Sequence, residues 1–358
     1  MILVAGISLS NMKPKVWDKN SQYFIPNLNA IMVSYSDFYK MPKLKNTAIE
    51  KGLNEALGIP AEISIYLDNG SFYFINKSDS NKKEYLDYEK FVLETKPDWF
   101  PIPRDYIPLP KMKYKEQKAC FERTMFINTH YQENGYVPVI HIGRFLKKYI
   151  TSINKNNAFS TKSNIAIGGI VPNLLRARKA IPYQQILDSL IDIRNKFSNH
   201  RIHIFGIGGT ATIHLAHLLG IDSADSSGWR NRAARGIIQL PGSGDRVVAE
   251  LGNWRGRRPS KEEWDIIEQC ICPACKEYGI EGLKENGING FCNRATHNLY
   301  TLINESDLIS IKLSTGDYSK WFKKHIINST YKPLIEYVVK KQFNPIGEGK
   351  KDGVIRGI

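Results

Sequence analysis

The stretch Ile63–Gly70, ISIYLDNG, joins a short apolar run to a polar turn. Similar junctions, in which an apolar run ends in Gly or Asp, recur at Ile167–Gly169, Phe205–Gly208 and Ala224–Ser227. Short β-rich runs separated by amphipathic helical patterns are typical of an α/β fold with a parallel sheet. In a (β/α)8 TIM barrel the active site is built from the loops after the strands, so polar residues from many strand ends converge there. A doubly wound sheet also binds ligands at strand ends, but at one switch point, and the wide spread of these junctions favours the barrel.

The sequence predicts both kinds of element that a barrel needs. Strands are expected at Ala30–Ser36, Ile63–Leu67, Val137–Ile142, Ile165–Gly169, Ile202–Phe205 and Ile237–Leu240. Helices are expected at Tyr114–Gln132, Tyr183–Ser198, Thr210–Leu219, Lys261–Gln269 and Tyr318–Lys341. The 358 residues suffice for one large domain of the barrel type. We expect a single barrel over residues 1–345, with a zinc-binding subdomain at about 265–300, followed by a loose basic tail over 346–358.

The charge balance is strongly basic. Fifty Lys and Arg residues against 35 Asp and Glu residues give a formal net charge of +15. Such a charge attracts nucleic acid, although membrane surfaces and acidic proteins would be attracted as well, and a Lys-rich proteome produces many such chains. The sequence contains neither a long uncharged apolar run nor a secretory signal pattern, so we expect a soluble cytoplasmic protein.

Three of the five cysteines lie within the six residues CICPAC, at Cys270, Cys272 and Cys275. Disulfides between such close neighbours gain little and would leave one thiol over, whereas thiolates at this spacing suit zinc. A downstream histidine, His297, completes a Cys3His set, with Cys292 as the competing fourth ligand. Because three thiolates leave little room for an open position, we expect a structural zinc ion. The alternative, three ordinary cysteines in a helix, is disfavoured by the proline inside the cluster.

Two carboxylates occupy the strand-end junctions. Asp68 follows the run ISIYL, and Asp225 lies in the segment GIDSADSS. Either residue alone is typical of a turn or a helix cap. Two aspartates at strand ends of one barrel can also divide the work of nucleophile and acid/base in a two-step displacement at a sugar carbon. A further junction, Gly168-Gly169, offers bare backbone against which a planar ligand can lie. The segment GIGG at 206–209 matches no nucleotide-binding pattern.

Arginines cluster near two tryptophans. They are Arg230, Arg232 and Arg235 beside Trp229, and Arg255, Arg257 and Arg258 beside Trp254. Guanidinium groups bind phosphates and aromatic faces stack on unpaired bases, so this mixture suits a nucleic-acid strand with an extruded base. A solvated basic face is the alternative.

Together these features resemble the tRNA-guanine transglycosylase superfamily, zinc-bearing (β/α)8 barrels that exchange a guanine in nucleic acid for a 7-deazaguanine. The resemblance extends from about Ile63 to Leu302, and its strongest motif is C-x-C-x-x-C followed by ATHN, which contains His297. It implies a general acid/base role for Asp68 in LDNGSF. It also implies that the nucleophile lies in GIDSAD, at Asp225, with Asp222 as the second choice.

The resemblance further implies a base-binding pocket. The amides of Gly168 and Gly169 would bind the base, Asp105 would read it, and Gly143 would lie after the fourth strand. The Gln pair usual in the family before this last glycine is replaced by His141-Ile142, and the segment after the nucleophile reads SSGWRNRAARG instead of Leu-Pro-Thr-Arg.

About sixty residues follow His297, too few for the C-terminal RNA-binding domains of archaeal tRNA enzymes. We therefore expect the branch that inserts a 7-deazaguanine, such as 7-cyano-7-deazaguanine, into DNA, with the same exchange on tRNA as the alternative. Other hypotheses are a zinc-bearing nucleic-acid-binding protein without catalysis, and a barrel glycosidase or nucleoside hydrolase. A homodimer or partner subunits remain open.

Overall fold

A curled, parallel sheet of seven strands forms the centre of the protein. The computed structural model describes residues 1–74, 82–131, 135–155, 162–170, 181–252, 254–327 and 329–343. The strands lie in the order β3-β2-β1-β7-β6-β5-β4, and all their pairings are parallel. They are β1 (Ile2–Gly6), β2 (Ala30–Ser34), β3 (Ser64–Asp68), β4 (Val139–His141), β5 (Asn164–Gly168), β6 (Arg201–Ile204) and β7 (Ser223–Ser226).

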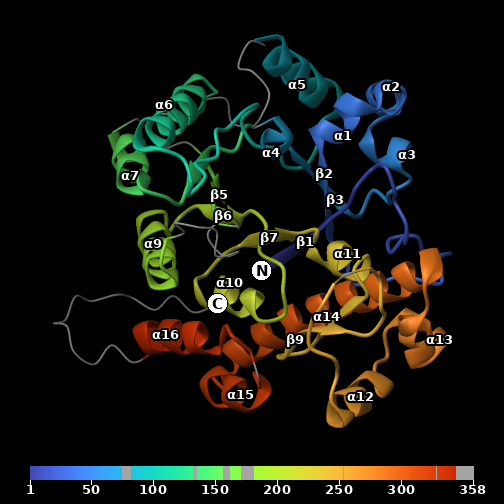
Figure 1. Cartoon of the computed structure of the whole chain (residues 1–358). Coiled ribbons are helices and arrows are strands. Elements are labelled where there is room, and N and C mark those ends of the chain that lie inside the picture. The colour runs from blue at the N-terminus through green and yellow to red at the C-terminus, as the bar shows by residue number, and fades with distance from the viewer. Residues whose placement is uncertain are drawn as a thin grey trace.

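Helices surround this sheet (Figure 1). They are α1 (Tyr35–Lys40), α2 (Pro42–Lys51), α3 (Leu53–Leu57), α4 (Ser71–Phe74), α5 (Lys82–Thr95), α6 (Tyr114–His130), α7 (Leu146–Lys155), α9 (Tyr183–Lys196), α10 (Thr212–Leu218), α11 (Gly228–Ala233), α12 (Lys261–Glu268), α13 (Pro273–Lys284), α14 (Gly287–Ser314), α15 (Tyr318–His325) and α16 (Lys332–Phe343). A separate antiparallel hairpin consists of β8 (Ile237–Leu240) and β9 (Gly244–Val247). Among the described helices, none has the length and apolar character needed to cross a membrane.

The two edge strands of the sheet, β3 and β4, are connected by an irregular segment. On one side, the amide of Leu67 in β3 donates to the carbonyl of Trp99 over 2.8 Å. On the other side, the amide of Ile102 donates to the carbonyl of Val137, just before β4, over 3.0 Å. The prediction of a parallel α/β fold is therefore confirmed, but regular pairing stops at seven strands and residues 98–102 lie between the edges as isolated bridges.

The core explains why the central strands have apolar sequences. Both faces of a parallel sheet are covered, so its strands are near-continuous apolar runs. In β5 the residues Ile165–Gly168 are all buried, and one apolar cluster extends from β1 through the sheet to α16. A smaller cluster lies under the hairpin, where Ile238 and Leu240 pack against Ile267 and Leu283 of α12 and α13.

Several predicted elements differ from the structure. The predicted strand Ile237–Leu240 is β8, which pairs in the hairpin and takes no part in the main sheet. The predicted helix Tyr318–Lys341 is broken into α15 and α16, because Pro333 in the first turn of α16 cannot continue a helix from the preceding residues. Strands β1, β7 and β9 were not among the predicted strands. The predicted basic tail lies outside the described residues.

Candidate active site and metal centre

Three aspartates lie at the carboxyl edge of the sheet. Asp68 is the last residue of β3, Asp225 is near the end of β7, and Asp105 follows the segment 98–102. Since the strands are parallel, their carboxyl ends meet at one edge. The three carboxylates interact electrostatically, because the charges of Asp105 and Asp225 both contribute to raising the pKa of Asp68.

One of the two carboxylate oxygens of Asp225 accepts a hydrogen bond from the protein. Its Oδ1 accepts a hydrogen bond of 2.8 Å from the amide of Gly206 and lies 3.5 Å from Nε2 of His203. Asp222, the second candidate for the nucleophile, begins the segment at the opposite end of β7. Its Oδ2 accepts from the amide of Ile202 over 2.8 Å and pairs with Arg194 over 3.0 Å. The structure therefore places Asp225, and not Asp222, at the edge where the other carboxylates lie.

The carboxyl group of Asp68 has a raised pKa although it accepts two hydrogen bonds. Its Oδ2 accepts hydrogen bonds from Ser34 Oγ over 3.0 Å and from the amide of Gly70 over 2.9 Å. Burial nevertheless raises the pKa of Asp68 to about 7, and the nearby Asp105 and Asp225 carboxylates act in the same direction. A carboxyl group with a pKa near the working pH can both donate and accept a proton.

Replacement of Asp68 by Asn is expected to change the pH dependence of stability. Because the folded-state pKa of about 7 is above the ordinary 3.8, the folded protein retains a proton that the unfolded chain releases. The stability that this proton contributes is complete below pH 3.8 and is lost as the pH rises through 7. Urea unfolding should show Asp68→Asn to be more stable than wild type at pH 8 by roughly 1–3 kcal/mol, with a smaller difference at pH 5. An equal difference at the two pH values would contradict the raised pKa.

Asp105 is buried and fully engaged with protein partners. Its Oδ1 accepts a hydrogen bond of 2.9 Å from the Asn69 side-chain amide, and its Oδ2 lies 3.0 Å from Nε2 of His141. Burial alone would raise the pKa of Asp105, but the contacts with His141, Asn69 and Ser71 lower it, so the group stays ionised. The sequence indicated Asp105 but gave no sign that His141, at the end of β4, is its partner.

The predicted glycines of the base pocket meet different steric conditions. A Cβ atom on Gly168 would lie 2.7 Å from Nδ1 of His141, and one on Gly169 would lie 2.9 Å from the Ile142 carbonyl oxygen. Gly169 also has a φ of +76°, a left-handed conformation that favours glycine. At Gly143 an added Cβ would make only an ordinary contact of 3.7 Å with Pro108. The backbone therefore requires glycine at 168 and 169 but not at 143.

The four predicted metal ligands form a compact cluster. Nδ1 of His297 lies 3.4 Å from Sγ of Cys270, 3.9 Å from Cys272 and 3.3 Å from Cys275, and all four ligand atoms lie within 4.8 Å of one another. Cys272 caps α13, whose first residue is Pro273, so the proline ends the loop and starts the helix. The competing ligand, Cys292, is buried outside the cluster.

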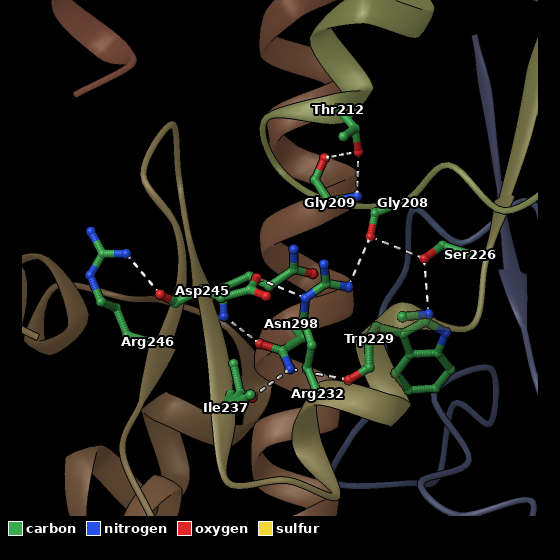
Figure 2. Close-up of polar contacts among 12 residues, drawn as sticks. Gly208, Gly209, Thr212, Ser226, Trp229, Arg232, Ile237, Asp245, Arg246 and Asn298 are labelled. Atoms are coloured by element: carbon green, nitrogen blue, oxygen red, sulfur yellow. Dashed lines mark hydrogen bonds and ion pairs between the residues drawn. The ribbon is translucent and has the colours of Figure 1, made fainter. Parts of the chain in front are cut away.

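Side chains near the metal cluster hold the segment that follows β7. His297 Nε2 lies 3.1 Å from the Gln239 carbonyl oxygen in β8, which leaves Nδ1 free to face the thiols. The neighbouring Asn298 donates to the carbonyls of Trp229 and Ile237 over 3.1 and 3.0 Å, and accepts from the Gln239 amide over 2.6 Å (Figure 2). One asparagine on α14 thus joins the hairpin to α11.

A second set of contacts connects α11 and the hairpin to β7, which carries the candidate nucleophile Asp225. Arg232 on α11 pairs with Asp245 of β9 over 2.7 Å and donates to the carbonyl of Gly208 over 3.3 Å (Figure 2). The same carbonyl accepts a hydrogen bond of 3.1 Å from Ser226, the residue after Asp225. The region of the metal cluster is therefore connected to the candidate nucleophile. Asn298, next to His297, contacts α11, and Arg232 of α11 shares the Gly208 carbonyl with Ser226, next to Asp225.

Comparison with known proteins finds relatives that share one name. No family model matches the chain. It is 25% identical over 340 residues to the tRNA-guanine(15) transglycosylase of Pyrococcus abyssi, covering 89% of this chain and 52% of that protein. The enzyme of the same name from Saccharolobus solfataricus is 25% identical over 87% of this chain and 61% of its own length, and that from Haloferax volcanii is 23% identical over 76% and 50%. The chain is thus similar over most of its length to proteins named tRNA-guanine(15) transglycosylase. It spans about half the length of the curated relatives it matches.

The six predicted nucleic-acid-binding arginines fall into two groups by burial. Arg230 is buried beneath the surface, where its guanidinium donates to the Asn11 carbonyl and packs against Phe291, so its prediction as a surface ligand is wrong. Arg232 is partly buried in its pair with Asp245. The remaining four are exposed: Arg235, Arg255, Arg257 and Arg258.

The two tryptophans beside these arginines differ in the same way. Trp229 is fully buried and donates to the Gly6 carbonyl over 3.1 Å. Trp254 is 54% exposed, and the guanidinium of Arg235 lies 4.0 Å from its ring centre. Two of the exposed arginines are partly neutralised, Arg257 by Glu263 at 3.9 Å and Arg258 by Glu250. Of the six predicted arginines, Arg255, Arg257 and Arg258, together with Arg235, are thus the ones exposed to a ligand.

Proposed function

We propose that this protein is a guanine transglycosylase that exchanges a guanine of RNA for a free 7-deazaguanine base. The observation that carries the proposal is that Asp225 and Asp68 lie at the carboxyl ends of β7 and β3, close enough for the charge of Asp225 to contribute to the raised pKa of Asp68. Relatives named tRNA-guanine(15) transglycosylase support tRNA as the polynucleotide. Exchange on DNA, which the sequence favoured, has no support from these relatives and becomes the second candidate.

The exchange takes place in two displacements at C1′ of the target nucleoside. In the first, a carboxylate oxygen of Asp225 forms a bond to C1′ while the bond from C1′ to N9 breaks, and Asp68 gives its proton to the departing guanine. In the second, the incoming base loses its ring proton to Asp68, its nitrogen attacks C1′, and Asp225 departs as a carboxylate. The glycosidic bond energy is retained in the covalent intermediate, so neither ATP nor a redox cofactor is consumed.

The base would bind at the same carboxyl edge of the sheet. The amides of Gly168 and Gly169, at the carboxyl end of β5, would bind the purine carbonyl oxygen. The pair of Asp105 and His141 would face the opposite edge of the base, and Gly143 would lie beside it. Because both Asp105 oxygens already have protein partners, His141 is the more available of the two for reading the base.

The metal that best suits the Cys3His cluster is zinc. In a tetrahedral site with bonds of about 2.3 Å to sulfur and about 2.0 Å to nitrogen, each S···N edge is about 3.6 Å long. The S···N distances of 3.3–3.9 Å fit this edge. Zinc bound there supplies cross-linking of the loop before α13 to α14 and takes no part in the exchange.

Two structural proposals accompany the function. Residues 98–102 occupy the eighth position of a (β/α)8 barrel, because they hydrogen-bond to both edge strands, and residues 1–345 form one domain around it. The exposed arginines with Trp254 are the nucleic-acid surface, in which the indole stacks on an unpaired base. Charge reversal at Arg255 should then weaken RNA binding and reduce its salt dependence, and unchanged salt dependence would exclude this surface.

The test is incorporation of labelled base. Labelled guanine or 7-cyano-7-deazaguanine is offered with bulk tRNA, duplex DNA or single-stranded DNA. Label retained in tRNA supports the proposal, and label retained only in DNA replaces RNA by DNA with the same mechanism. Release of free guanine without incorporation indicates a hydrolase, and binding of nucleic acid with neither reaction indicates a non-catalytic binding protein.

A further inference from the structure

The pairing of β6 with β7 sets a histidine beside the proposed nucleophile. His203 is in register with Ser223, and its Nδ1 lies 2.9 Å from Ser223 Oγ. Side chains two residues apart on a strand point to the same face, so Asp225 projects beside Ser223. The other ring nitrogen, Nε2, consequently reaches to 3.5 Å from Oδ1 of Asp225.

The His203 ring is fixed in this orientation. It is 2% exposed, and the rings of Trp99, Phe205 and Tyr66 surround it at centroid distances of 4.7, 4.9 and 5.8 Å. Its Nε2 has no hydrogen-bond partner among the described residues. A buried imidazole nitrogen without a partner is costly unless a contact forms in another state of the site. The nearest candidate for that contact is the Asp225 carboxylate.

The contacts of Ser223 favour a proton on Nε2. The Ser223 hydroxyl lies 2.9 Å from Nδ1 of His203 and can donate a hydrogen bond to it. An Nε2 without hydrogen would turn its lone pair toward the Asp225 carboxylate, so a hydrogen on Nε2 with Ser223 donating to Nδ1 is the favoured arrangement. An imidazole that accepts at Nδ1 carries its proton at Nε2, directed at Asp225.

We propose that His203 is a positioning residue that, together with the Gly206 amide, holds Oδ1 of Asp225 so that Oδ2 faces the reacting carbon. The inference rests on the proposed function, since it requires Asp225 to be the nucleophile. Among the described residues Oδ2 has no hydrogen-bond partner, whereas Oδ1 has both neighbours. In the covalent intermediate, the hydrogen on Nε2 stays on His203 and is not transferred to Asp225. When the second base attacks, Nε2–H stabilises the charge that returns to the departing carboxylate.

The experiment is single-turnover trapping of the covalent RNA adduct in the full chain, with His203→Phe and His203→Gln. Phenylalanine matches the aromatic surroundings but has no donor, whereas glutamine restores one. We expect the phenylalanine variant to form adduct about 10- to 100-fold more slowly, with KM for RNA, melting temperature and metal content unchanged. The glutamine variant should recover most of the wild-type rate, a result that loss of packing would not produce.

Four outcomes overturn the inference in distinguishable ways. If His203→Phe forms the adduct at the wild-type rate, His203 has no positioning role and the proposed function stays intact. Equal slowing in both variants, with a lowered melting temperature, makes the residue structural. If the phenylalanine variant does not fold, Ser223→Ala gives the same test, because it releases Nδ1, and a wild-type rate there overturns the inference. Absence of any adduct in the wild-type protein overturns the proposed function together with this inference.

Discussion

Replacement of Asp225 by Asn is expected to reduce base exchange by at least about 10³-fold while folding and metal content stay at wild-type values. The asparagine has the same shape, and its carbonyl oxygen can still accept the 2.8 Å hydrogen bond from the Gly206 amide. It cannot, however, form the ester to C1′ on which both displacements depend. The measurement is label incorporation into tRNA, with gel detection of the covalent adduct.

The matched control for this variant is Asp222→Asn, three residues earlier on the same segment. Asp222 pairs with Arg194 and accepts from the Ile202 amide at the amino end of β7. Its replacement should lower stability by about 1 kcal/mol and leave the adduct intact at saturating substrate. If Asp225→Asn still forms adduct, or if Asp222→Asn is the variant that loses it, the assignment of the nucleophile is wrong.

Replacement of Cys272 by Ser is expected to remove the bound metal and to destabilise the protein by several kcal/mol. Cys272 is fully buried, caps α13 and lies in the four-residue cluster, so one change removes a ligand and weakens a helix start. Binding free energy at a structural zinc site is folding free energy, about 10–16 kcal/mol in isolated zinc-finger peptides, and part of it is lost with one ligand. Metal content by mass spectrometry and thermal unfolding are the measurements.

The control for this variant is Cys292→Ser, which changes a buried thiol outside the cluster. We expect it to keep one zinc per chain. Exchange activity should fall in the fraction of Cys272→Ser protein that remains folded. The reason is that Asn298 and Arg232 connect the region of the metal cluster to the segment around Asp225. A metal-free Cys272→Ser protein with wild-type stability would falsify the structural role, and metal loss in Cys292→Ser would change the ligand set.

Features that depend on neighbours in the sequence were predictable. The spacing of Cys270, Cys272 and Cys275, together with Pro273, specifies a tight loop followed by a helix start, and the structure has both. Most strands with continuous apolar sequences were located within one or two residues. The polar strand β7, of sequence SADS, was visible only as a junction, because its burial comes from β1 and β6 on either side.

Other features depended on which distant segments meet, and only the tertiary structure decided them. No local pattern distinguishes the buried Arg230 from the exposed Arg255, since burial is imposed by Phe291 and the Asn11 backbone from remote parts of the chain.

The same holds for the two histidines at the carboxyl edge. His141 faces Asp105, and His203 faces Asp225. The chemistry of these aspartates could be expected from their residue type and their place at strand ends. Their partners could not, because partners across a parallel sheet are set by register between strands that are tens of residues apart. The sequence by itself thus predicted the Cys3His cluster and the candidate carboxylates, and the packing of the sheet determined which side chains lie beside those carboxylates.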